Sequence, residues 1–190
     1  WTDPVTGFKI PKGQYANLKW RAALLKRAEE DLGFRRDLWS ACRASLHLWI
    51  NAFAFTYHQF EVGSEGLRKG ADHADMPMVT WDVQDDILTQ FIVNLDKAED
   101  ILVNKSRDMG ASWLCIDFMH WLWLFRDDAQ LLELSRTEQY VDQSGNMKAL
   151  FQKHDYINKW LPDWTVPPDS MPGGKNRTKM HMANAWNRSC

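Results

Sequence analysis

The sequence has few cysteines, almost no net charge and no apolar run long enough to cross a membrane. Its three cysteines, Cys42, Cys115 and Cys190, are far apart, which argues against a disulfide framework or a zinc site built on paired cysteines. The 23 basic and 25 acidic residues nearly cancel, so no overall field attracts nucleic acid. The longest apolar stretches, 46–57 and 113–125, contain polar residues and are shorter than a membrane span.

What the chain does contain is aromatic and apolar residues at helical spacing. Eleven tryptophans indicate large buried aromatic surfaces or a surface that binds a partner. With 190 residues, of which 45% are hydrophobic, the chain can bury one core with an appended subdomain. Apolar residues at steps of three and four predict helices over residues 14–31, 37–60, 82–95, 112–126 and 148–160.

Short apolar runs between these helices predict strands over about 100–104 and 130–135, and a further strand is predicted over 178–186. Because helices and strands alternate after Pro77, the predicted fold class is α/β with a parallel sheet. A glycine-containing stretch reads as a linker. The predicted organisation is a Trp-rich helical region over 1–62, a linker over 63–76 and an α/β domain over 77–190.

The segment 105–112 lies between a predicted strand and a predicted helix, which is the context that a phosphate-binding loop requires. When Gly110 and Ser112 are aligned with the end of the usual G-x-x-x-x-G-K-[ST] pattern, the cation is displaced to Lys105, with Arg107 as a second candidate. Backbone amides of 107–112 and the helix dipole would face a phosphate. The Ser112 hydroxyl would bind Mg²⁺ and also cap the helix. The alternative is an ordinary strand-to-helix turn that binds nothing.

Gln84 is a candidate for recognising a base. A carboxamide carries both donors and acceptors, so it can pair with the amino group and a ring nitrogen of adenine. Trp81 or Met78 would pack on the base. The alternative interpretation is a glutamine at the start of a helix beside a core tryptophan.

Arg136 follows the second predicted strand, where loops border the site in open α/β sheets. It would contact a γ-phosphate or, as the favoured interpretation, form a salt bridge with Glu138 or Asp142. The basic run 175–179 would contact DNA phosphates or be a solvated loop. The six histidines show no ligand spacing, so they are interpreted as core or surface residues rather than metal ligands.

The displaced cation is the basis of a family resemblance. The pattern Lys-x-Arg-x-x-Gly-Ala-Ser-Trp over 105–113 resembles the deviant Walker A loop of the large terminase subunit of tailed phages, an ATP-driven motor that packs DNA into a procapsid. Residues 76–84 resemble the adenine-recognition segment that precedes this loop. The resemblance covers roughly residues 75–190 and includes a second core strand with its exit, a helix and a Pro-Trp turn, at 134–142, 150–157 and 161–164.

The resemblance implies a P-loop (ASCE-type) ATPase domain with ATP and Mg²⁺ as cofactors. The implied adenine-binding residues are Trp81 and Gln84, Arg136 is a further candidate, and Ser112 would hold Mg²⁺ through the nucleotide. The implied partners are double-stranded DNA, the portal, the small terminase subunit and further copies in a homo-oligomeric ring. No membrane is involved, and the implied location is the host cell cytoplasm. The implied phosphate-binding residues are Lys105, Ser106, Arg107, Asp108, Met109, Gly110, Ala111 and Ser112.

Family members carry a Walker B segment, an apolar run ending in Asp-Glu, and a C-terminal nuclease domain, and neither occurs in this sequence. The chain is therefore expected to be an N-terminal piece that stops before Walker B, with the catalytic glutamate beyond Cys190. The complete protein would be an ATPase, and this piece alone would not hydrolyse ATP. Two rival hypotheses are a fragment of a P-loop motor of the helicase class and a non-enzymatic, Trp-rich helical adaptor or assembly module.

Overall fold

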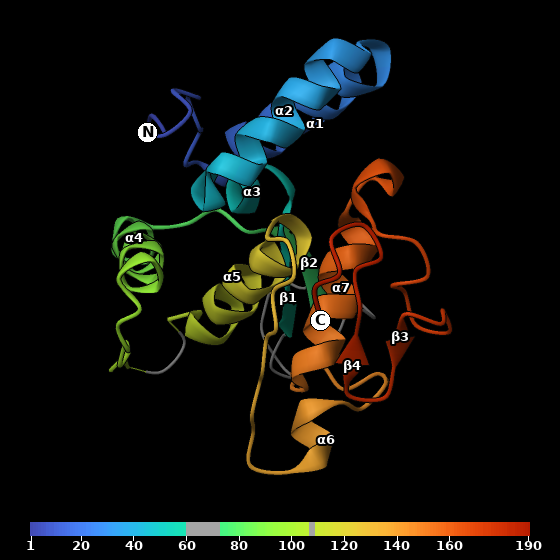
Figure 1. Cartoon of the computed structure of the whole chain (residues 1–190). Coiled ribbons are helices and arrows are strands. Elements are labelled where there is room, and N and C mark those ends of the chain that lie inside the picture. Colours follow the sequence, from blue (N-terminus) through green and yellow to red (C-terminus); the bar gives the residue numbers. More distant parts are fainter. Residues whose placement is uncertain (60–72, 107–108) are drawn as a thin grey trace.

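The computed structural model describes residues 1–59, 73–106 and 109–190 (Figure 1). This part of the chain is a mixture of helices and short strands, and both of its strand pairs, β1–β2 and β3–β4, are antiparallel. In chain order the elements are α1 (Gln14–Glu30), α2 (Leu32–Ala44), α3 (Leu46–Phe53), β1 (Phe55–Gln59), β2 (His73–Pro77), α4 (Asp82–Lys97), α5 (Ala111–Phe125), α6 (Glu138–Val141), α7 (Leu150–Trp160), a 3₁₀ turn (Asp163–Thr165), β3 (Arg177–Thr178) and β4 (His181–Met182).

The single helix predicted over 37–60 is wrong, because local capping divides this region. Asp31, and not the expected Asp37, caps α2 by accepting hydrogen bonds from the backbone N–H groups of Gly33 and Phe34. Ser45 then ends α2 and caps α3, since its hydroxyl accepts from the Leu48 N–H at 3.0 Å. A serine that offers its own acceptor favours a helix start over continuation.

The chain leaves helical geometry again at Ala54 and enters a hairpin. In this hairpin β1 pairs with β2, with Phe55 opposite Pro77. Residues 73–76, predicted as part of the linker, therefore form most of β2, and the remainder of that linker, 63–72, lies outside the described residues. In β1 the ring of Phe55 packs on the ring of Trp160, with 4.6 Å between the two ring centroids.

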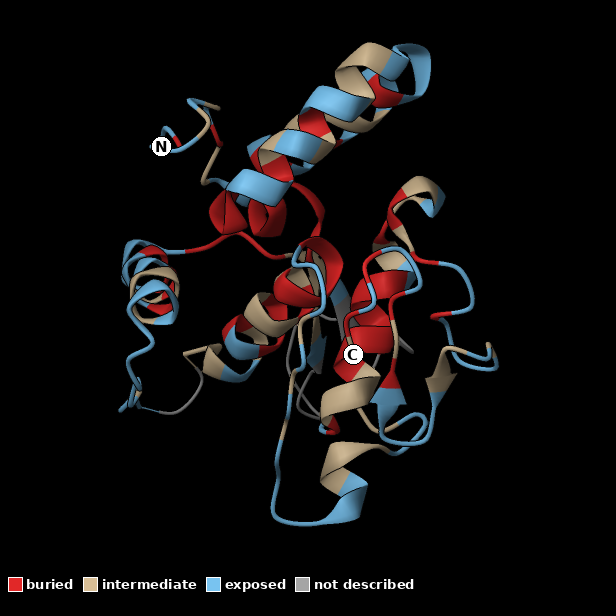
Figure 2. Cartoon of the chain, viewed as in Figure 1, coloured by how far each residue is buried: buried red, intermediate tan, exposed pale blue. Residues whose placement is uncertain are grey.

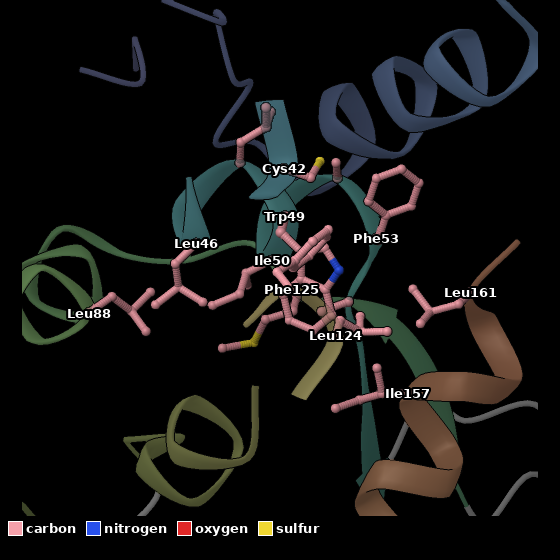
Figure 3. Close-up of a cluster of buried hydrophobic side chains, with 14 of the residues drawn as sticks. Cys42, Leu46, Trp49, Ile50, Phe53, Leu88, Leu124, Phe125, Ile157 and Leu161 are labelled. Atoms are coloured by element: carbon pink, nitrogen blue, oxygen red, sulfur yellow. The ribbon is translucent and has the colours of Figure 1, made fainter. Parts of the chain in front are cut away.

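Helix α5 lies at the centre of the fold and contacts α3, α4 and α7 (Figure 1). Residues along α3, α5 and α7 are largely buried, whereas α1 and α2 show more exposed surface (Figure 2). The buried cluster joins side chains from both halves of the sequence, among them Trp49 of α3, Leu88 of α4 and Ile157 of α7 (Figure 3). Each such side chain contributes roughly 1.5–3 kcal/mol through burial.

The predicted strands at 100–104 and 130–135 are not formed as regular strands in the described structure. Several of their apolar side chains are at the surface, with Leu102 93% exposed and Leu134 80% exposed, whereas Val103 and Leu131 pack against the core. The predicted strand over 178–186 is reduced to the short β3–β4 pair. An isolated strand gains nothing without a neighbour to complete its backbone hydrogen bonds, which explains why these runs stay irregular.

One backbone contact near 130–135 resembles strand pairing. The Cys190 N–H donates to the Ala129 carbonyl at 3.0 Å, and the Leu131 N–H donates to the Cys190 carbonyl at 2.8 Å. Cys190 thus bonds to the residues before and after Gln130, which is the hydrogen-bond arrangement of parallel strands.

None of the helices in the described ranges combines the length and the apolar character that crossing a bilayer would demand.

Candidate functional site

The candidate phosphate site is the N-terminal end of α5. Gly110 occupies the N-cap position with φ +71°, in the left-handed region, and its carbonyl accepts from the N–H groups of Trp113 and Leu114. Ser112 was expected to cap this helix, and that expectation is wrong because Ser112 already lies inside the first turn. Within the described residues, the N-cap of α5 makes no side-chain hydrogen bond. The amides of Ala111 and Ser112 and the positive end of the helix dipole are therefore left for another acceptor.

Gln84 connects the start of α4 to this loop. Its Nε2 donates to the Met109 carbonyl at 3.1 Å, and its Oε1 accepts from the Trp81 N–H at 3.1 Å. A Cβ atom on Gly110 would lie 3.0 Å from the Gln84 Nε2. Glycine at 110 thus serves both the left-handed conformation and the close approach of the amide. The two candidate sites that the sequence suggested, one for adenine and one for phosphate, are brought into direct contact.

The tryptophan beside Gln84 is at the surface. Trp81 is 54% exposed, whereas Met78, the other residue expected to pack on a base, is 7% exposed and belongs to the core. A carboxamide has two N–H donors and two acceptor lone pairs. The two bonds that Gln84 makes leave one donor and one lone pair unused, and the Gln84 residue itself is only 4% exposed.

A groove runs along the first turns of α5 and is lined by three of the predicted phosphate-binding residues, Lys105, Ala111 and Ser112. Of these, Lys105 and Ser112 are exposed. Ser106 is exposed on the same loop, and the predicted ligands Arg107 and Asp108 lie outside the described residues. The groove is lined by Val103, Lys105, Ala111, Ser112, Cys115, Ile116, Met119, Leu132, Glu133, Leu134 and Leu150.

The salt bridge favoured for Arg136 is wrong. Its guanidinium lies over the Tyr140 ring, 4.3 Å from the ring centroid. The two carboxylates expected to pair with it have other partners: Glu138 pairs with Lys179, and Asp142 pairs with Arg177 at 2.9 Å. A cation–π contact at an exposed site is worth about 0.5–1 kcal/mol.

The basic run 175–179 is occupied within the protein. Arg177 bonds two carboxylates, with Nε 2.8 Å from the Asp155 Oδ1 and Nη2 2.9 Å from the Asp142 Oδ1. Burial disfavours the charge of Arg177, but the hydrogen bonds to Asp142 and Asp155 outweigh it and raise its pKa. Lys175 pairs with Asp169 at 3.3 Å. Arg177 is therefore held within the fold by two carboxylates, which neither sequence interpretation anticipated, whereas Lys175 and Lys179 are exposed, as the solvated-loop interpretation predicted.

Sequence reasoning also missed two buried ionisable residues, Arg21 of α1 and Asp117 of α5. Asp117 of α5 is fully buried, and neither of its carboxylate oxygens has a hydrogen-bond partner in the described chain. Burial raises its pKa well above the usual range, although the positive charge of Arg21 opposes the shift. Burial lowers the pKa of Arg21 to about 9, and its guanidinium donates to the carbonyls of Ala54, Ile50 and Met78. The signal in the sequence was a single aspartate within the apolar run 113–125.

No group of three or more His, Cys, Asp or Glu residues within the described ranges is arranged to hold a metal ion. Comparison with known protein families, with curated proteins and with solved structures gives no match to this chain.

Proposed function

We propose that this chain is the nucleotide-binding part of a viral DNA-packaging motor of the large terminase class, and that the groove at the start of α5 takes the triphosphate of Mg-ATP. The observation that carries the proposal is the contact of the Gln84 amide with the Met109 carbonyl beside Gly110. This contact places Gln84, whose amide can hydrogen-bond to a base, beside the loop 105–112, whose amides can bind phosphates.

Five residues have a defined part in this proposal: Lys105, Ala111 and Ser112 of the groove, and Trp81 and Gln84 beside the loop. The amides of Ala111 and Ser112, at the open end of α5, bind phosphate oxygens. Lys105, exposed on the groove wall, neutralises the β- and γ-phosphates, and the Ser112 hydroxyl binds the Mg²⁺ that accompanies them. The exposed Trp81 ring stacks on adenine while Gln84 bonds to its edge.

In the complete motor, residues 100–104 and 130–135 would be strands of a parallel sheet. The bonds that join Ala129 and Leu131 to Cys190 support this part of the proposal, because they have the parallel pattern. Hydrolysis and the translocation of double-stranded DNA would require a Walker B carboxylate outside this sequence, together with the portal, the small subunit and the other copies of a ring.

Binding of Mg-ATP measured by isothermal titration calorimetry tests the proposal. Lys105→Ala is expected to weaken binding at least about tenfold, since a charge-assisted bond to phosphate is lost. Lys148→Ala, at an exposed lysine outside the groove, is the matched control and should leave the affinity unchanged. Ser112→Ala should remove most of the difference between Mg²⁺ and EDTA conditions. Equal affinities for Lys105→Ala and Lys148→Ala would remove the groove from the proposal.

The adaptor hypothesis keeps one observation in its favour. Leu102, Leu132 and Leu134 are 93%, 77% and 80% exposed, which is unusual for leucines and suits a partner surface. Under this hypothesis Leu132→Ser and Leu134→Ser reduce concentration-dependent self-association in sedimentation experiments, and ATP does not bind. Under the motor hypothesis the same variants leave Mg-ATP binding in place.

A further inference from the structure

Three polar contacts, two of them buried and one partly buried, connect α5, α7 and the segment 131–134 in succession. The Nε2 of His120 in α5 is 3.1 Å from the Asn158 Oδ1 in α7. The Nδ1 atoms of His120 and His154 face each other at 2.9 Å, and the Nε2 of His154 is 2.8 Å from the Glu133 Oε1. Thus His120 and His154, which are 34 residues apart in the sequence, connect the two helices, and the series of contacts ends at the Glu133 carboxylate.

Each of these three contacts needs one proton between its two heavy atoms. The amide oxygen of Asn158 only accepts, so the Nε2 of His120 must carry a proton and donate it. If His120 is neutral, its Nδ1 is a bare acceptor, and the Nδ1 of His154 must then donate. Two neutral imidazoles supply only these two protons, so the contact between His154 and Glu133 requires a third, carried by one of its two atoms.

Burial keeps His120 neutral, which fixes this count. His120 is fully buried, and its ring packs against Trp49 at 5.8 Å and Trp123 at 5.0 Å. Burial lowers its pKa well below the usual range, and the nearby His154 lowers it further, although the bond to Asn158 opposes the shift. The third proton therefore resides at the contact between His154 and Glu133.

Other ionisable groups surround the acidic end of this network. From α7, Lys153 faces Glu133; burial lowers the pKa of Lys153, and the carboxylate opposes that shift. On α5, burial raises the thiol pKa of Cys115, and the negative charges of Glu133 and Asp117 raise it further. His181 of β4 and the C-terminal Cys190 line the same cavity as His154 and Glu133.

We propose that His120, His154 and Glu133 form a proton-dependent latch, which holds the segment 131–134 on α5 and α7 while three protons are bound and releases it when the third is lost. Without that proton, the bare lone pair of the His154 Nε2 faces the Glu133 carboxylate at a side chain that is only 14% exposed. A buried contact between two acceptors is unfavourable, so the segment moves toward solvent.

The latch stands independently of nucleotide binding. It nevertheless acts on a wall of the groove, because Leu132, Glu133 and Leu134 line that groove with Lys105 and Ser112. A change of pH would thus alter one wall of the groove without titrating any phosphate ligand assigned above.

Nitrogen-15 NMR of the histidine side chains tests the proton count directly. In the intact chain, recorded from about pH 5 to about pH 8, we expect neutral His120 protonated at Nε2 and His154 protonated at Nδ1 throughout. The third proton should leave the contact between His154 and Glu133 as the pH rises. Hydrogen exchange of the Leu131 amide, which bonds to the Cys190 carbonyl, should then accelerate about tenfold beyond the intrinsic pH effect.

Glu133→Gln separates the latch from a purely structural role. An amide supplies a permanent N–H to the bare His154 Nε2, so the Leu131 amide should lose its extra pH dependence while both imidazoles stay neutral. His181→Gln, which changes an exposed histidine of the same cavity, should keep the wild-type profile. A His120 protonated at Nδ1, or a Glu133→Gln variant with an unchanged pH profile, would overturn the proposal. The NMR count holds even if the variant folds poorly.

Discussion

The two ends of α5 satisfy their free backbone groups in opposite ways. At the C-terminal end, the Trp123 carbonyl accepts from the side-chain amides of Asn184 and Asn187, at 2.8 Å and 3.0 Å, and the Leu124 carbonyl accepts from Asn187 at 3.1 Å. At the N-terminal end, the cap residue is Gly110, which has no side chain to offer. One end is closed by the protein, and the other opens on the groove.

This difference is informative because both ends belong to one buried helix. The asparagines that close the C-terminal end lie more than sixty positions later in the chain, so the fold supplies distant side chains where a helix end needs them. A helix carries partial positive charge at its N-terminus. An open positive end, with Lys105 on the same groove, is suited to an anion, whereas the closed end offers nothing to a ligand.

The largest expected effect on the free energy of unfolding comes from removing a side chain that bonds to the carbonyls at the C-terminal end of α5. Asn187→Ala removes the donor to two buried carbonyls and the acceptor for the Ser189 N–H. Because those groups would be left unpaired, we expect the free energy of unfolding to fall by about 1–3 kcal/mol. Urea denaturation followed by far-ultraviolet circular dichroism measures this change.

An exposed asparagine provides the control for that variant. Asn104 lies on the surface of the segment that precedes the loop, so Asn104→Ala should change the free energy of unfolding by less than about 0.5 kcal/mol. If both variants gave the same loss, the side-chain caps of α5 would not be responsible for closing its C-terminal end.

The next effect concerns the glycine at the open end. Gly110→Ala places a side chain at φ +71°, 3.0 Å from the Gln84 Nε2, and we expect a cost of about 1–2 kcal/mol from the left-handed conformation. Gly145 has a similar φ of +77° with nothing within 4 Å of its Cβ position. Gly145→Ala therefore carries the conformational cost alone. Only Gly110→Ala should also weaken Mg-ATP binding, because only it displaces Gln84.

The sequence predicted helices far better than strands, and the reason is physical. Helix bonds are local, so the stripes over 82–95 and 112–126 were enough to place α4 and α5 within two residues. Strand bonds need a partner, and no local pattern shows whether one is present. The apolar runs at 100–104 and 130–135 therefore gave a strand signal in segments that lack regular partners in the described structure.

For the candidate site, too, the sequence predicted local features better than contacts between distant residues. It singled out Gln84 and the loop 105–112 separately, and the structure shows that they are in contact. The pairing of His120 with His154 could not be foreseen, because residues on different helices carry no shared spacing. Arg177 was misread for a similar reason: its partners Asp142 and Asp155 are distant in sequence, so a run of basic residues looked solvated or suited to DNA.

The smallest expected effect on the free energy of unfolding comes from adding a negative charge at the N-terminal end of α5. Ser112→Asp places a carboxylate in the first turn of α5, where it interacts favourably with the helix dipole, so the free energy of unfolding should rise by about 0.3–1 kcal/mol. The same carboxylate occupies the position proposed for phosphate, so Mg-ATP binding should be lost while the fold becomes more stable.

Ser112→Asn has nearly the same shape without the charge and should gain less stability. Loss of binding combined with a gain in stability cannot come from unfolding. Retention of Mg-ATP affinity in Ser112→Asp would mean that the nucleotide does not sit at this helix end.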